Sequence, residues 1–237
     1  MIIAVDGPSG SGKSSAARGT AAVLGLRYLD TGAMYRAVTW WLLEHGVDLA
    51  DTDSVVSQVL GLAITVGTEP GDPAVRVDDI DVTAAIRSRR VSNAVSAVAA
   101  VPQVRRHLIQ MQREIIDLAI AAGGGIVAEG RDIGTVVAPD AAVKVFLTAS
   151  EQARAERRAA ELAGIDQAAG PRPTASQGPT ADVTRYEQAL RDRRDAPQTQ
   201  RAADAVEIDA TALGLDDVIG RIVSLATTTR AGAAWTR

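Results

Sequence analysis

A glycine-rich segment near the start of the chain constrains the fold more than any other feature. Residues 7–14 read Gly-Pro-Ser-Gly-Ser-Gly-Lys-Ser, follow an apolar run at residues 2–5 and precede alanine-rich sequence. The G-x-x-x-x-G-K-[ST] spacing between a strand and a helix is typical of a phosphate-binding loop. A chance glycine turn could share this composition, but the strand-to-helix context favours the loop. The segment therefore predicts that the chain binds a nucleoside triphosphate.

The residues of this loop have separate expected roles. Backbone N–H groups of the glycine-rich turn converge on phosphate oxygens, and the N-terminus of the following helix adds a partial positive charge. Lys13 is expected to reach the β- and γ-phosphates, and the Ser14 hydroxyl is expected to ligate Mg²⁺. The residues expected to bind ATP here are Gly7, Pro8, Ser9, Gly10, Ser11, Gly12, Lys13, Ser14 and Ser15.

The composition argues against several classes of protein. The 237 residues are 46% hydrophobic, which allows a sizeable core, and the net charge of −4 provides no basic field for nucleic acid or anionic lipid. The chain has no cysteine, so disulfides and thiolate metal sites are excluded. No apolar run approaches the ~20 residues of a membrane span, and the fold is expected to begin at residue 1 without a signal peptide. We expect a cytoplasmic monomer that acts on small molecules, without nucleic-acid or membrane partners.

Alternating helical and extended patterns predict an α/β fold. Strands are expected at residues 2–5, 27–29, 126–128, 143–147 and 206–209, and helices at residues 14–24, 31–46, 83–97, 102–122, 150–162, 182–194 and 215–225. Thr31 is expected to cap its helix, and residues 62–82 predict a small antiparallel insert. Continuous apolar strands are typical of a parallel sheet covered on both faces, whose ligands lie at the carboxyl ends of the strands. Residues 163–181 are rich in Gly, Pro, Ala, Ser and Gln and predict a mobile segment.

A polar segment follows the predicted strand at residues 126–128. Glu129, Arg131 and Asp132 fall at the sheet edge where the phosphate loop is also expected. A Gly-Arg-Asp turn could be a surface loop with an ion pair, but its position beside the loop favours function. Arginine offers a planar, always charged fork for phosphate, and an aspartate can accept an amino proton or bind a metal-bound water.

Arginine is dense on both sides of the segment predicted to be mobile. These arginines are Arg154, Arg157, Arg158, Arg191, Arg193, Arg194 and Arg201. Charged runs on helices usually face solvent or pair along the helix. The alternative is a hinged lid, because phosphoryl transfer needs electrostatic stabilisation and exclusion of water.

Taken together, several motifs resemble those of one enzyme family. In chain order they are Gly7–Ser14, Leu29–Arg36, Ile86-Arg87, Asn93–Ala99, Pro102–Arg105 and Glu129–Val137. They extend over nearly the whole chain and resemble bacterial cytidylate kinase, a P-loop nucleoside monophosphate kinase. The resemblance implies transfer of the ATP γ-phosphoryl group to CMP or dCMP, with Mg²⁺, in pyrimidine nucleotide metabolism.

The resemblance also implies an arrangement of domains. It implies a P-loop NTPase three-layer fold with a parallel central sheet, an inserted NMP-binding domain with a small antiparallel sheet, and a lid. The CORE domain would comprise residues 1–30, 106–150 and 195–226, the NMP-binding domain residues 31–105 and the LID residues 151–194. Residues 227–237 would form a flexible tail.

Residue roles follow from the resemblance as well. The implied catalytic residues are Lys13, Arg131, Arg158 and Arg191, and the implied ATP site adds Arg154 and Arg157 to the phosphate loop. The acceptor nucleotide would be bound by Thr31, Arg36, Ser96, Arg105, Arg131, Asp132, Arg191 and Asp195. Of these, Ser96, Arg105 and Asp132 would read cytosine, whose acceptors suit an arginine and a hydroxyl and whose amine suits a carboxylate.

One segment departs from the family pattern. Arg191 and Asp195 fit the run expected on phosphate and ribose, but an arginine expected three residues after the aspartate is replaced by Gln198. A second register uses Arg194 and Arg201 instead and places Gln198 at the ribose. We favour the first register because a carboxylate is the better acceptor for a ribose hydroxyl. The tip of the predicted lid, residues 164–181, has no clear match in the family.

Two other functions share the phosphate loop. A nucleotide-driven switch or regulatory ATP-binding module begins in the same way, and so does a kinase for another nucleoside monophosphate or a sugar acid. A guanine-reading Asn-Lys-x-Asp motif is absent from the sequence. A switch hydrolyses slowly without an acceptor, whereas a kinase consumes ATP quickly only when its acceptor is added.

Overall fold

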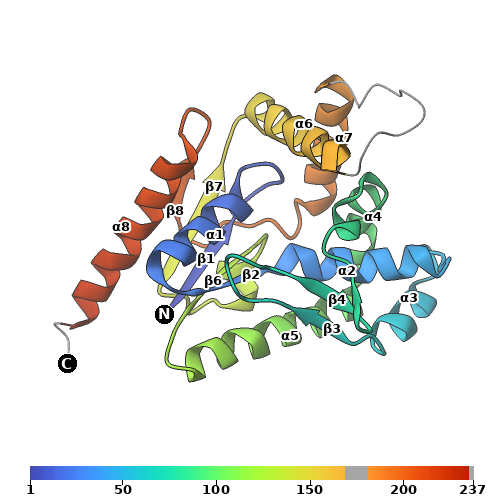
Figure 1. Cartoon of the computed structure of the whole chain (residues 1–237), viewed down its shortest axis with the longest axis horizontal. Helices are drawn as coiled ribbons and strands as arrows, with labels where there is room; N and C mark the ends of the chain where they lie inside the picture. The colour runs from blue at the N-terminus through green and yellow to red at the C-terminus, as the bar shows by residue number, and fades with distance from the viewer. Residues whose placement is uncertain (169–180, 235–237) are drawn as a thin grey trace.

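A computed structural model of the chain describes residues 1–168 and 181–234. In this part, a parallel sheet of five strands has the order β2-β6-β1-β7-β8 (Figure 1). The strands are β1 (Ile2–Asp6), β2 (Arg27–Asp30), β6 (Ile126–Gly130), β7 (Val143–Thr148) and β8 (Val206–Asp209). Asp6, the last residue of the central strand, is in register with Gly130 on one side and Phe146 on the other. The phosphate loop therefore leaves the sheet between β6 and β7.

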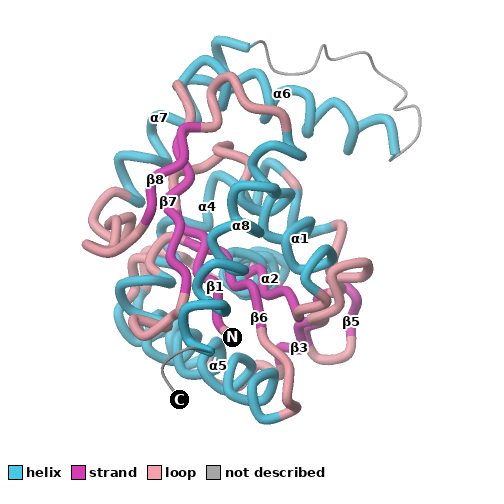
Figure 2. The backbone as a smooth tube through the Cα atoms, turned by 90° about the vertical axis from the view of Figure 1, so that its left-hand side faces the viewer, coloured by secondary structure: helices cyan, strands magenta, loops and turns pink. Residues whose placement is uncertain are grey.

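Helices cover both faces of this sheet, as predicted. Helices α1 (Lys13–Leu24) and α8 (Leu215–Ala234) lie on one face, and α2 (Thr31–Glu44) and α5 (Pro102–Ala121) lie on the other. Figure 2 shows α8 and α1 in front of the strands. Along β1, Ile3 and Val5 pack with the first pair of helices, whereas Ala4 packs with the second. The alternation explains why β1 is apolar throughout and confirms the three-layer α/β prediction.

The predicted antiparallel insert is present. Strands β3 (Ile64–Val66), β4 (Val75–Val77) and β5 (Ile80–Asp81) pair antiparallel, and buried residues of β4 pack with Ala33 and Ala37 of α2. Helix α3 (Thr52–Val59), which the sequence analysis does not predict, precedes the insert. The side chain of Asp51 caps α3 by accepting a hydrogen bond from the Ser54 amide at 3.1 Å.

One predicted helix cap and one predicted continuous helix are wrong. Asp30, not Thr31, caps α2, because its carboxylate accepts the Ala33 amide at 2.9 Å. Thr31 is the first helical residue, and its hydroxyl instead donates to the Glu129 carbonyl at 2.7 Å. The helix predicted over residues 83–97 is split into the 3₁₀ turn η1 (Ala85–Arg87) and helix α4 (Arg89–Ala99). Ser88 separates them, because its extended backbone and its hydroxyl form the cap of α4.

The region around β6 and the lid helices also differs from the prediction. Strand β6 includes Glu129 and is followed by one turn of π-helix, η2 (Ile133–Val137). Helix α6 (Glu151–Ala168) extends past its predicted end and packs against α7 (Ala181–Asp195), which also contacts α4. Residues 163–168 of the segment predicted to be mobile are therefore helical. Residues 169–180 of that segment lie outside the described residues.

Helix α8 continues to Ala234, so the tail predicted from Thr227 is wrong over residues 227–234. Ala226 remains buried, and the hydroxyls of Thr227, Thr228 and Thr229 donate to carbonyls one turn earlier. These bonds satisfy the polar side chains within the helix. None of the helices described is both long and apolar enough to cross a membrane.

Candidate active site

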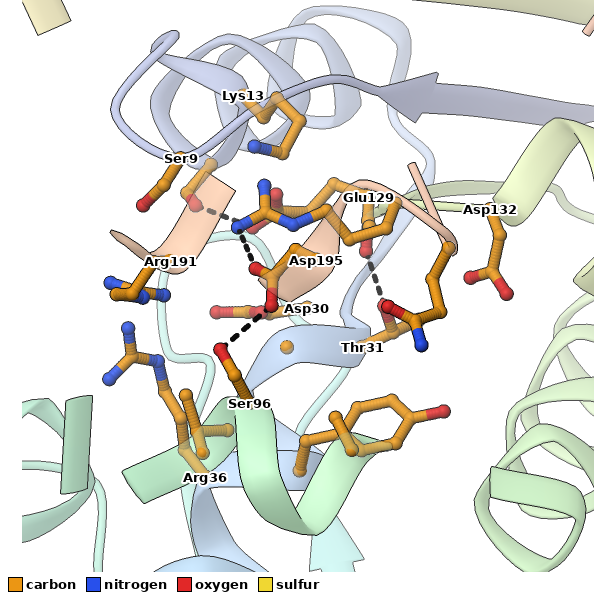
Figure 3. Close-up of a pocket in the computed structure, with 18 of the residues that line it drawn as sticks. Ser9, Lys13, Asp30, Thr31, Arg36, Ser96, Glu129, Asp132, Arg191 and Asp195 are labelled. Atoms are coloured by element: carbon orange, nitrogen blue, oxygen red, sulfur yellow. Dashed lines mark hydrogen bonds and ion pairs between the residues drawn. The ribbon is translucent and has the colours of Figure 1, made fainter. Parts of the chain in front are cut away.

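The carboxyl ends of β1, β2 and β6 open into a cavity of about 180 Å³. The cavity is lined by every residue predicted to bind the acceptor nucleotide: Thr31, Arg36, Ser96, Arg105, Arg131, Asp132, Arg191 and Asp195 (Figure 3). These side chains come from α2, α4, α5, α7 and the turn after β6, which are far apart in the sequence. Ser9, Gly10, Lys13 and Ser14 of the phosphate loop also belong to the wall.

A second cavity of about 360 Å³ lies on the other side of the phosphate loop. Its walls are residues 10–16, Leu147, Arg157 and a set after β8, namely Ala210, Leu213, Gly214, Leu215 and Val218. Sequence reasoning missed this last set, although it follows a predicted strand and so could have been placed at the same sheet edge. The two cavities share Gly10, Lys13 and Ser14. A ligand in one cavity therefore meets a ligand in the other at the phosphate loop.

Glycines of the phosphate loop have positive φ angles, which other residues rarely adopt. Gly7 has φ +148°, and a Cβ there would lie 2.1 Å from the Leu147 carbonyl oxygen. Gly12, with φ +97°, caps α1 in the left-handed region. Lys13 Nζ donates to the Pro8 carbonyl at 2.7 Å. Burial, reinforced by the positive charge of Arg131, lowers the pKa of Lys13 to about 7.

Glu129 is a buried carboxylate beside the loop, and the sequence analysis expected it at this sheet edge without giving it a role. Its Oε1 accepts hydrogen bonds from the Ser14 hydroxyl and, at 3.2 Å, from the Tyr28 hydroxyl. Burial raises the pKa of Glu129, with Asp30 adding to the rise and Lys13 opposing it. Its place in the Glu-Gly-Arg-Asp segment was the available signal. The structure adds that this carboxylate reaches the predicted magnesium ligand Ser14.

Side chains from two other segments converge on Asp195 at the end of α7. Ser96 Oγ donates to Asp195 at 2.7 Å and Arg131 donates to its other oxygen at 3.0 Å (Figure 3). Arg131 also donates to the Gly7 carbonyl at 2.7 Å. These bonds connect the end of α7 to both Ser96 of α4 and the phosphate loop.

A further group of charges lines the first cavity. Arg105 forms an ion pair with Asp132, whose pKa is raised by burial although Arg105 opposes the rise. Arg36 donates to the Ser92 hydroxyl at 2.8 Å. Arg87, which no prediction assigned to the site, pairs with Asp30 at 2.6 Å and lines the same cavity. The cavity wall thus holds more guanidinium groups than the sequence analysis assigned.

The predicted lid arginines take different positions. Arg154 is buried, donates to the Ser9 carbonyl at 3.1 Å and pairs with Asp192 of α7, so it is among the lining residues of neither cavity. Arg157 lines the second cavity and donates to the Ala210 carbonyl at 2.6 Å. Arg158 belongs to α6, but its side chain lies outside the described residues.

The geometry of residues 191–201 favours one of the two registers. Arg191, Asp195 and Gln198 line the first cavity. Arg194 is exposed, and Arg201 pairs with Glu207 at 2.5 Å. Only the first register therefore brings both of its key residues to the cavity wall.

The donor set suits a magnesium ion held largely by phosphate and water. Among the described residues there is no group of three or more His, Cys, Asp or Glu side chains that could hold a metal. Ser14 and Glu129 offer one hydroxyl and one carboxylate beside the phosphate loop. Mg²⁺ is usually bound in this way by one or two protein oxygens together with substrate phosphates and water.

Comparison with known proteins adds a family match. The matching family model is described as cytidylate kinase and covers residues 3–228. A cytidylate kinase of Streptomyces coelicolor is 48% identical over 232 residues, which are 98% of this chain and 95% of that protein. One of Streptomyces griseus is 46% identical over 225 residues, with coverage of 95% and 92%. One of Rhodococcus opacus is 48% identical over 227 residues, with coverage of 94% and 93%.

Proposed function

Because this chain belongs to the cytidylate kinase family, we propose that its first cavity binds CMP or dCMP and that its second cavity binds ATP. The enzyme phosphorylates CMP, and the family implies ATP as the donor. The observation that carries the placement is that the two cavities share Gly10, Lys13 and Ser14. Donor and acceptor phosphates would therefore meet at Lys13.

The acceptor nucleotide is proposed to lie with its phosphate toward the β1 edge. Arg36, Arg131 and Arg191 bind this phosphate, with Thr31 nearby, because guanidinium groups pair well with phosphate oxygens. Arg105 and Ser96 donate to the acceptors of cytosine, and Asp132 accepts from its amine. Asp195 accepts from the ribose and is held in place by Arg131, while Ser96 turns its single hydroxyl proton from Asp195 to cytosine when the nucleotide binds.

The chemistry is transfer of the γ-phosphoryl group to an oxygen of the CMP phosphate. Such transfer needs positioning and charge stabilisation rather than a covalent enzyme intermediate. Lys13 neutralises charge on the transferring group, and the nearby triphosphate favours its ammonium form. Arg131 and Arg191 do the same from the acceptor side, and Arg157 does so from α6. The helices α6 and α7 exclude water from the site.

Mg²⁺ is proposed to bind next to the phosphate loop. The Ser14 hydroxyl and the Glu129 carboxylate fit it, since both are oxygen donors and already contact each other. When bound, the ion supplies positive charge to the β- and γ-phosphate oxygens. Glu129 orients the Ser14 hydroxyl by accepting a hydrogen bond from it. The lone pairs of the hydroxyl oxygen would then be left for the metal.

A panel of acceptors in a coupled assay of ADP release tests this function. CMP and dCMP should give the highest kcat/KM, and ATP consumption without an acceptor should be slow. Sites that hydrogen-bond a base discriminate strongly against analogues that leave those groups unmatched. AMP as the best acceptor would show that the base-reading residues are misassigned. Equal ATP consumption with and without acceptor would favour a switch.

We also propose that the enzyme acts as a monomer in the cytoplasm. Light scattering at assay concentration tests the oligomeric state. A dimer with activity that falls on dilution would contradict it.

A further inference from the structure

Asp6 is a buried carboxylate outside both cavities. It ends the central strand β1 and has 4% of its surface exposed. Its two carboxylate oxygens accept hydrogen bonds from two consecutive backbone amides, those of Ile133 and Gly134, each at 2.8 Å. These amides open the π-turn η2 and directly follow Arg131 and Asp132.

This contact connects β1 to the first cavity, which is the proposed CMP site. Arg131 and Asp132 both line that cavity, whereas Asp6 is absent from its wall. Asp132 has φ −144° and ψ 28°, so the backbone changes direction between β6 and η2 at this residue. The side chain of Asp132 can face cytosine only while the turn keeps this direction. The two amides that donate to Asp6 belong to the two residues that directly follow Asp132.

We propose that Asp6 is a positioning residue for CMP, which fixes the turn after β6 so that Arg131 and Asp132 present their charges to the nucleotide. This inference rests on the proposed CMP site. A carboxylate is required because two N–H groups need two acceptors, and an asparagine of the same shape offers only one. The turn packs closely at Gly134, where a Cβ would lie 3.2 Å from the Lys144 stem.

The electrostatics support a role other than stabilising the fold. Burial raises the pKa of Asp6 to about 6, and Asp132 adds to the rise, whereas the two amides and Lys13 oppose it. The fold therefore keeps a carboxylate whose charged form it disfavours. Charged groups held in this way are characteristic of functional sites.

The other end of η2 provides a matched control. Arg113 of α5 donates to the carbonyls of Val136 at 2.6 Å and Val137 at 3.1 Å. It therefore holds the same turn from its C-terminal side, where the amides of Val136 and Val137 bond to the Asp132 carbonyl independently of Arg113. A variant at Arg113 loosens the turn without releasing the two residues proposed to bind CMP.

The test compares Asp6→Asn with Arg113→Met by steady-state kinetics with each substrate varied in turn. We expect Asp6→Asn to lower kcat/KM for CMP by about 10- to 100-fold, because small displacements of binding groups have effects of that size. KM for ATP should change by less than about twofold, since the phosphate loop keeps its own contacts. Arg113→Met should leave KM for both substrates within about twofold of wild type, although its Tm falls.

Three results would overturn the inference. They are an unchanged kcat/KM for CMP in Asp6→Asn, an equal loss in Arg113→Met, and an equal rise in KM for ATP and CMP. Asp132→Ala separates the two proposals: if it also leaves CMP kinetics unchanged, the CMP site is wrong and this inference fails with it. If only Asp132→Ala raises KM for CMP, the role of Asp6 alone is wrong. Should Asp6→Asn not fold, Asp6→Ser replaces it in the same comparison.

Discussion

Several ionisable residues around the phosphate loop are buried, and burial disfavours their charged forms. Lys13 has its pKa lowered to about 7, and the pKa values of Glu129 and Asp132 are raised, with burial as the leading cause in each case. A low-dielectric site with fixed charges stabilises charge that develops in a transition state more strongly than water does. The unfavourable burial of these groups is thus consistent with a role in phosphoryl transfer.

Lys13 allows the simplest test at this scale. We expect Lys13→Ala to fold and to reduce turnover by roughly 100-fold or more, because removing one fixed charge from a transition-state site typically has that effect. The measurement is kcat with saturating ATP and CMP, with circular dichroism to confirm folding. A folded variant with near-wild-type turnover would exclude Lys13 from the chemistry.

Asp6 predicts a pH dependence of stability. Its pKa rises from 3.8 to about 6 on folding, so the folded state binds the proton more tightly and its contribution to stability is lost as pH rises toward and through 6. Between pH 4.5 and 7.5 the wild type should therefore lose about 2 kcal/mol of unfolding free energy relative to Asp6→Asn. Urea unfolding of both proteins at the two pH values measures this difference. A difference that stays constant, or that grows in favour of the wild type at pH 7.5, would contradict the shift.

At the scale of elements, one face of α7 carries two residues that line the first cavity. Arg191 and Asp195 are four positions apart and line the cavity, whereas Arg194 is exposed and Arg201 pairs with Glu207. Residues four apart share a helix face, which explains how the end of α7 supplies both groups.

Alanine substitutions along this segment test that placement. We expect Arg191→Ala to reduce kcat/KM for CMP more than Arg194→Ala or Arg201→Ala does, because only Arg191 lines the cavity. Asp195→Ala should reduce activity with CMP more than with dCMP, which lacks the 2′-hydroxyl. A loss concentrated at Arg194 and Arg201 would support the other register.

The elements also show what local sequence could and could not predict. The apolar runs and the phosphate loop predicted β1, α1, β6 and β7, because their patterns are set by burial on both faces and by glycine geometry. The break at Ser88 and the π-turn η2 were missed, because side-chain caps and tertiary hydrogen bonds decide them. The continuation of α8 was missed because its threonines are weak helix formers whose hydroxyls bond within the helix.

At the scale of the whole molecule, the sheet order determines which residues meet. Strands β2, β6 and β1 are neighbours, so their carboxyl ends bring Asp30, Glu129 and Gly7 to one edge. The resemblance to a family implied eight residues that would bind the acceptor nucleotide, and the structure brings all eight to the first cavity. It gave no role to Glu129, Arg87 or the wall after β8, because their contacts depend on packing between distant segments.

The ratio of kcat/KM for CMP to that for UMP, measured in the wild type and in Asp132→Asn, tests whether the enzyme recognises cytosine through Asp132. In the proposed site Asp132 accepts from the cytosine amine, and the carbonyl of uracil at the same position would face a carboxylate. An asparagine can donate to that carbonyl. We expect the ratio to fall by about tenfold or more in Asp132→Asn, through a loss with CMP and a gain with UMP. An unchanged ratio in a folded, active variant would contradict the proposed recognition of CMP.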